Sequence, residues 1–251
     1  LSSDAVFELY TYAVEYDMDV LFFGANSFYT DVALCKDFPD YDEYYQFKVI
    51  SPDITTGTAL FNLLIKKHEY RVSPCMQFLK ADFVKKNNIL FVAGILHEDN
   101  PFTLQTTLLA ERCSRINKPY YLRRVRSGSI MTKKKSFDNT YGYFVGIIKM
   151  ISFIQFNRFD EETNQCAKDF IQSLWTSAKK EYVNLSVQEK EKFKKMMPLE
   201  KMLFPVFFST VAYAKKESSV PFQTNGAASP IVDEASLIRA SASYRIGRII
   251  T

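Results

Sequence analysis

The chain has 251 residues, of which 47% are hydrophobic and 24% charged, so it has the composition of an ordinary globular protein and enough length for one well-buried core. Its net charge of +4 is too small to indicate nucleic acid as a partner, and suits a phosphate-bearing ligand or an anionic membrane surface. Four scattered cysteines and only two histidines disfavour a structural zinc site.

Helices and strands alternate through the first half of the chain. Periodicity and capping residues predict helices at 4–16, 56–69, 81–87 and 101–113, and strands at 19–24, 72–79, 89–95 and 114–125. The aromatic-rich segment at 30–49 matches no clear pattern. Strands that alternate with helices predict a mostly parallel sheet.

The second half is helical in pattern. Helices are predicted at 139–156, 160–182, 186–197 and 199–216. The fold class is therefore α/β: a partial, Rossmann-like mixed sheet followed by a helical C-terminal appendage. The predicted domains are a sheet domain at 1–138, the helical appendage at 139–217, a linker at 218–230 and an amphipathic tail at 231–251.

Two adjacent carboxylates mark the predicted junction of a strand and a helix. An apolar run ends in His97, Glu98 and Asp99, and the helical pattern begins at about Pro101. Many α/β proteins place catalytic groups at such a junction. A carboxylate there can take the proton of an attacking hydroxyl. The alternative is that Asp99 or Asn100 only caps the following helix.

A dense cationic loop follows about twenty residues later. Arginine side chains and loop hydroxyls can stabilise the charge of a phosphate group. The candidate phosphate-binding residues are Arg123, Arg124, Arg126, Ser127 and Ser129. In extended structure Arg124 and Arg126 share one face and Arg123 takes the other. The alternative is a solvated basic turn.

These segments, in this order and spacing, resemble the bacterial family 2 glycosyltransferases with the GT-A fold. The similar stretches are Ser-Pro-Cys-Met-Gln at 73–77, His-Glu-Asp at 97–99, Leu-Leu-Ala-Glu-Arg at 108–112, Arg-Arg-Val-Arg-Ser-Gly-Ser-Ile-Met-Thr at 123–132 and Tyr-Gly-Tyr-Phe at 141–144. The resemblance implies that Asp99 is the catalytic base with Glu98 beside it, and that the cationic loop binds the donor diphosphate. Gln77 and His97 are then expected at the acceptor, although Gln77 can equally be an ordinary strand residue.

The resemblance also implies what surrounds this part of the enzyme. It covers about the first three-fifths of the chain and makes the chain the C-terminal portion of an inverting glycosyltransferase, inactive alone. The nucleotide-binding half and the D-x-D motif that holds a divalent metal, Mn or Mg, are expected before it. Asp17-Met18-Asp19 is formally D-x-D, but it precedes a strand instead of following one, so no metal ligand is assigned here.

The expected partners are a nucleotide-sugar donor, a UDP-sugar, and a glycan or lipid-linked acceptor of bacterial surface polysaccharide synthesis, with no nucleic acid. Apolar and arginine residues in the tail at 231–251 predict a peripheral contact with an anionic membrane, in the cytoplasm at the inner face of the plasma membrane. The same residues can equally form an ordinary packed helix. The alternative is a non-catalytic module that binds a glycan or a membrane surface.

Overall fold

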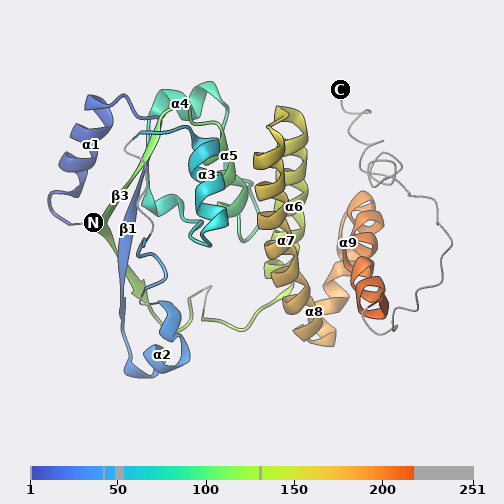
Figure 1. Ribbon diagram of the computed structural model, residues 1–251. Coiled ribbons are helices and arrows are strands. Elements are labelled where there is room, and N and C mark those ends of the chain that lie inside the picture. The colour runs from blue at the N-terminus through green and yellow to red at the C-terminus, as the bar shows by residue number, and fades with distance from the viewer. Residues whose placement is uncertain (1, 42, 49–53, 130–131, 218–251) are drawn as a thin grey trace, which may run out of the picture. The chain divides into compact units, whose positions relative to one another are not determined.

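The computed structural model describes residues 2–41, 43–48, 54–129 and 132–217 (Figure 1). Two compact units divide the chain, Leu1–Lys190 and Glu191–Thr251. The predicted linker and tail lie outside the described residues. Among the described residues, no helix combines the length and the apolar character that crossing a bilayer requires.

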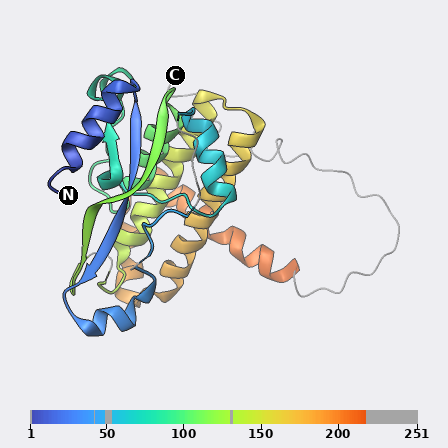
Figure 2. The same ribbon diagram turned by 60° about the vertical axis from the view of Figure 1, so that its left-hand side comes forward.

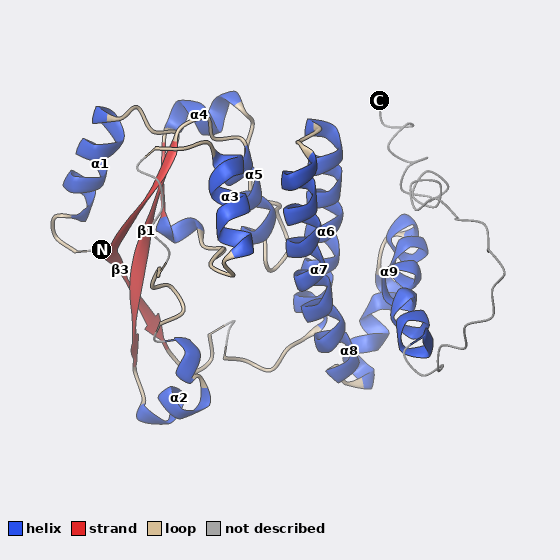
Figure 3. Cartoon of the chain, viewed as in Figure 1, coloured by secondary structure: helices blue, strands red, loops and turns tan. Residues whose placement is uncertain are grey.

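A three-stranded mixed sheet is the centre of the first unit (Figure 3). The central strand β1 (Val20–Tyr29) pairs antiparallel with β2 (Gln77–Leu79) and parallel with β3 (Cys113–Val125). The first six residues of β1 are buried, as expected for a strand covered on both faces. This confirms the predicted α/β class with a mixed sheet.

Helices cover both faces of the sheet (Figures 1 and 2). On one side lies α1 (Ala5–Glu15), whose Ala5 and Leu9 join the apolar core around Leu21 and Phe23. On the other side lie α3 (Gly57–Lys66) and α5 (Asp99–Leu108). The two helices meet closely at a glycine, because a Cβ on Gly57 would lie 1.7 Å from the Thr107 carbonyl oxygen.

Two long helices complete this unit, α6 (Phe137–Asn157) and α7 (Glu161–Asn184). They pack on each other, on α5 and on α3. A buried hydrogen bond of 3.0 Å from Asn62 Nδ2 to Thr163 Oγ1 joins α3 to α7. The sequence placed a domain boundary between residues 138 and 139, whereas the compact unit that contains the sheet continues to Lys190.

The remaining elements are short or belong to the second unit. They are α2 (Val32–Asp37), α4 (Ala81–Lys86), α8 (Val187–Glu191), α9 (Pro198–Glu217), and 3₁₀ turns at Pro39–Tyr41, Pro74–Met76 and Lys192–Lys195. In the second unit, Phe204 packs on Phe193 with ring centroids 4.4 Å apart. In place of the single helix predicted at 186–197, the structure has α8 followed by the 3₁₀ turn at Lys192–Lys195.

The predicted strand at 89–95 was wrong. Its residues form no strand, and Leu90 and Phe91 are 66% and 50% exposed. The backbone turns at Asn88 and at Gly94, both with positive φ, so the apolar run is confined between two turns. The following helix begins at Asp99, two residues earlier than predicted. The acids at 97–99 thus lie at a junction of loop and helix.

A glycine in α6 generates a prediction on stability. A Cβ on Gly142 would lie 2.0 Å from the Leu96 carbonyl oxygen, whereas a Cβ on Gly146 would meet nothing closer than 3.7 Å. We expect Gly142→Ala to lower the free energy of unfolding by ~1–3 kcal/mol through overpacking. Gly146→Ala, the matched control, should leave it unchanged or raise it by up to ~1 kcal/mol. Urea denaturation measures both, and equal midpoints would contradict the close contact.

Candidate functional site

The predicted base Asp99 lines a cavity of about 750 Å³ in the first unit. A left-handed turn precedes it, with a φ of 64° at His97. Asn100 fixes this turn, because its backbone N–H and its side-chain Nδ2 both donate to the His97 carbonyl, at 3.2 and 3.1 Å. Asp99 is the first residue of α5, and Glu98 before it makes no side-chain cap bond.

Burial changes the acidity of Asp99. It raises the pKa of this carboxyl from 3.8 to about 6, and the nearby Glu98 carboxylate adds to the rise, while backbone N–H groups oppose it. A base with a pKa close to the working pH is the more effective proton acceptor, and at pH 7 this group is mostly ionised. Asp99 therefore has the position and the acidity that a general base needs.

His97 is neutral beside it. Its ring stacks on Tyr143 of α6, with centroids 3.9 Å apart and planes 17° apart. Burial lowers the pKa of His97 from 6.5 to about 4, and the Lys135 cation lowers it further. The buried Nε2 atom has no hydrogen-bond partner among the described residues. The neutral ring can exchange a hydrogen bond with a ligand hydroxyl.

Arg123 enters the cavity between two tyrosines. Its guanidinium lies 4.5 Å from the ring centroid of Tyr41 and 5.1 Å from that of Tyr45. Burial raises the pKa of Tyr45 to about 12, although the Arg123 charge opposes this rise. Tyr45 therefore stays neutral at pH 7. The rings of Tyr41 and Tyr45 offer their faces to Arg123, which supplies the positive charge.

The other candidate phosphate-binding residues, Arg124, Arg126, Ser127 and Ser129, do not line the cavity. Strand alternation places Arg123 inward and Arg124 outward, and Arg126 and Ser127 are exposed as well. The hydroxyl of Thr132 accepts from the Ser129 N–H at 3.0 Å and donates to the Arg126 carbonyl at 3.0 Å. The loop is thus held by its own hydrogen bonds.

Two further candidates lie outside the cavity lining, namely Gln77 and Glu98. Gln77 belongs to β2, and its Oε1 accepts from Thr106 Oγ1 of α5 at 3.0 Å. Glu98 acts on the site through its charge, which raises the pKa of Asp99. Of the predicted residues, the structure brings Asp99, His97 and Arg123 together.

An aromatic wall, made of Tyr41, Tyr44 and Tyr45, was not predicted from the sequence. Arg71 anchors it, because its Nε donates to the Tyr44 carbonyl at 2.9 Å and its guanidinium lies 4.7 Å from the Tyr44 ring centroid. The sequence feature that could have indicated this wall is the density of tyrosine at 41–45, in a segment without helical or strand periodicity.

Helix α7 forms the opposite side of the cavity, which the sequence also did not predict. The residues that line it are Asp169, Phe170, Ser173, Leu174 and Ser177. Lys135 connects the cationic loop to this helix through an ion pair with Glu181, at 3.6 Å. The remaining lining residues are Ile65, Lys66, His68, Tyr70, Arg71, Val72, Asn100, Lys135 and Tyr143.

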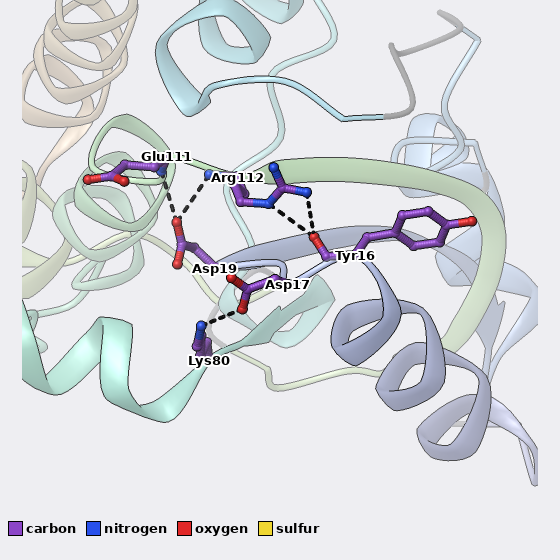
Figure 4. A network of polar contacts seen from close by, with 6 residues as sticks. All are labelled: Tyr16, Asp17, Asp19, Lys80, Glu111 and Arg112. Carbon is purple, nitrogen blue, oxygen red and sulfur yellow. Dashed lines mark hydrogen bonds and ion pairs between the residues drawn. The ribbon is translucent and has the colours of Figure 1, made fainter.

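The formal D-x-D of this chain has structural bonds (Figure 4). Asp17 pairs with Lys80 at 2.6 Å, and Asp19 Oδ2 accepts from the N–H groups of Glu111 and Arg112 at 2.9 and 3.1 Å. The Asp19 bonds tie the start of β1 to the segment between α5 and β3. The Asp17–Lys80 pair ties the turn before β1 to the residue between β2 and α4. Among the described residues, no group of three or more His, Cys, Asp or Glu side chains could hold a metal ion.

Comparisons with known proteins found no matching family model and no significant match among curated proteins. Solved structures of TarS from S. aureus resemble part of the chain. TarS 1–349 covers 76% of this chain and 48% of its own, with 19% identity and a TM-score of 0.47. The match to its complex with UDP covers 80% of this chain and 48% of TarS, with 18% identity and a TM-score of 0.45. The match to its complex with UDP-GlcNAc covers 59% of this chain and 39% of TarS, with 21% identity and a TM-score of 0.43. The chain thus spans less than half of those TarS chains.

Asp99 and His97 shift the pH dependence of stability in opposite directions. Between pH ~4 and ~6 the folded chain holds more of the Asp99 proton than the unfolded chain, so this group lowers the free energy of unfolding as pH rises. Between pH ~4 and ~6.5 the unfolded chain holds the His97 proton that the folded chain has lost, so this group raises the free energy of unfolding as pH rises. The two contributions nearly cancel in the unmodified chain.

We expect single variants to reveal the two slopes. In Asp99→Asn the free energy of unfolding should rise by up to ~3 kcal/mol from pH 4 to 6.5. In His97→Asn, which tolerates the left-handed backbone, it should fall over the same range. Urea denaturation across this range gives the profiles. Three parallel profiles would show that neither group is buried as described.

Proposed function

We propose that this chain carries the acceptor and base part of an inverting, nucleotide-sugar-dependent glycosyltransferase. The observation that supports this most is Asp99, a carboxyl with a pKa raised to about 6 on the wall of a cavity that also holds Arg123. The motif series at 73–144 that resembles the family 2 enzymes supports the same class. Its substrates and pathway belong to the proposal.

The reaction uses the groups of the cavity in a simple order. The oxygen of an acceptor hydroxyl attacks the anomeric carbon of the donor sugar, and the bond from that carbon to the nucleoside diphosphate breaks. The hydroxyl proton passes to the Asp99 carboxylate. Direct displacement inverts the anomeric carbon. Arg123 supplies positive charge to the leaving phosphate or to an acceptor oxygen.

The rest of the donor site is proposed from the resemblance. Arg124, Arg126, Ser127 and Ser129 are accessible to a diphosphate that approaches from outside the cavity. A divalent metal, Mn or Mg, would be held by a D-x-D of the complete enzyme and would neutralise the diphosphate. The donor is a UDP-sugar and the acceptor a glycan or lipid-linked hydroxyl of bacterial surface polysaccharide synthesis. By itself the chain should be inactive.

The role of Asp99 separates an enzyme from a glycan-binding module. In the complete enzyme, Asp99→Asn should lower kcat by ~10²–10⁴-fold, the range typical of a lost general base, with donor affinity little changed. Glu98→Gln is the matched control and should cost less, because Glu98 does not line the cavity. Release of UDP from UDP-GlcNAc and other UDP-sugars is the measurement. Near-normal turnover by Asp99→Asn would exclude it as the base.

We also propose that the tail at 231–251 lies on an anionic membrane at the inner face of the plasma membrane. The tail combines isoleucines with Arg239, Arg245 and Arg248. Complete protein should co-sediment with vesicles that contain anionic lipid, and protein cut after Pro230 should do so several-fold less. Equal sedimentation of the two forms would assign the tail a structural role.

A further inference from the structure

Helix α7 presents a polar stripe to the cavity. Asp169, Ser173 and Ser177 follow one another at four-residue spacing, which places them on one face of the helix. All three are exposed and all three line the cavity, with Phe170 and Leu174 beside them. We call these three residues the α7 stripe.

The α7 stripe offers hydrogen-bond acceptors. The Ser173 hydroxyl donates to the Phe170 carbonyl at 2.7 Å, and the Ser177 hydroxyl donates to the Ser173 carbonyl at 3.2 Å. A hydroxyl that donates within its own helix keeps its lone pairs for a ligand. Asp169 adds carboxylate oxygens, of which Oδ1 accepts from Gln165 at 2.8 Å.

Donors and apolar surface lie in the same cavity. Lys66 and Arg71 contribute cationic donors, and Phe170 and Tyr44 contribute ring surface. Convergent polar groups set in apolar walls are what a small-molecule site requires. A sugar ring has hydroxyls around its edge and C–H groups on its faces, so it can use both kinds of wall.

The α7 stripe is held rigidly. Phe170 packs edge-on against Phe61 and Tyr70, with centroids 6.4 and 5.1 Å away. The bond between Asn62 and Thr163 and the ion pair between Lys66 and Glu162 hold the beginning of α7 on α3. A preformed wall costs little entropy when a ligand binds.

We propose that the α7 stripe is a second sugar subsite and that the acceptor is a chain of at least two polyhydroxylated units. The reacting unit lies at Asp99, and the next unit lies along the α7 stripe. The cavity volume of about 750 Å³ is within the 300–1,000 Å³ of sites for drug-sized ligands, and a disaccharide is of that size. The position of the first unit rests on the proposed function.

Binding of this chain to an array of bacterial oligosaccharides and their constituent monosaccharides tests the proposal. At least one oligosaccharide should bind ~10-fold or more tightly than its units. Ser173→Leu should abolish this gain by filling the subsite. Thr176→Leu is the matched control, because Thr176 is exposed, back-bonds to the Gln172 carbonyl at 2.9 Å and does not line the cavity. Leucine favours helix more than serine or threonine, so both variants should fold.

Three results would overturn the second subsite: no bound oligosaccharide, affinity independent of length, or equal effects of Ser173→Leu and Thr176→Leu. The proposed function fails separately. If Asp99→Asn leaves transfer by the complete enzyme unchanged while Ser173→Leu still removes the length dependence, the subsite holds and the base assignment falls. If transfer depends on Asp99 but Ser173→Leu affects short and long acceptors equally, the base assignment holds and the second subsite is excluded.

Discussion

The contact between α6 and the turn before α5 determines where the candidate base lies. The backbone of α6 touches the Leu96 carbonyl at Gly142, where any side chain would clash. The next residue, Tyr143, stacks on His97. His97 has a positive φ, which is uncommon for a residue with a side chain and costs on the order of 1 kcal/mol or more. The packing of α6 offsets that cost and holds Asp99 at the cavity wall.

The same burial acts on two ionisable groups with opposite results. It disfavours the charged form of each, so the pKa of Asp99 rises and that of His97 falls. The outcome at neutral pH is one carboxylate beside a neutral imidazole. The neutral His97 ring adds no positive charge to the cavity, while Arg123 keeps its charge between two tyrosines.

Sequence patterns predicted the elements whose neighbours are local, and failed where tertiary contacts decide. The helix after Thr56 was predicted because its N-cap is local in sequence. The Thr56 side chain accepts from the Ala59 N–H, three residues later. The apolar run at 89–95 has the composition of a buried strand, yet it forms no strand, and the Phe91 ring stacks on the Phe102 ring of α5 with centroids 3.9 Å apart. Composition alone cannot tell those two fates apart. Motifs in the sequence made Asp99 and Arg123 candidates, and both line the cavity. The aromatic wall was not predicted, because arginines distant in sequence contact it.

The helical region after residue 138 was predicted as helical, and two of its helices contribute directly to the candidate site. Its sequence has the periodicity of packed helices, which predicts a separate appendage. In the structure α6 positions the turn at His97 and α7 forms a wall of the cavity. A four-residue spacing of Asp169, Ser173 and Ser177 is indistinguishable in sequence from an ordinary solvated helix face. These three residues line the cavity because α7 packs against α3, where the buried hydrogen bond between Asn62 and Thr163 joins the two helices. The proposed base thus lies at the start of α5, and the proposed second subsite lies on α7, far along the chain from it.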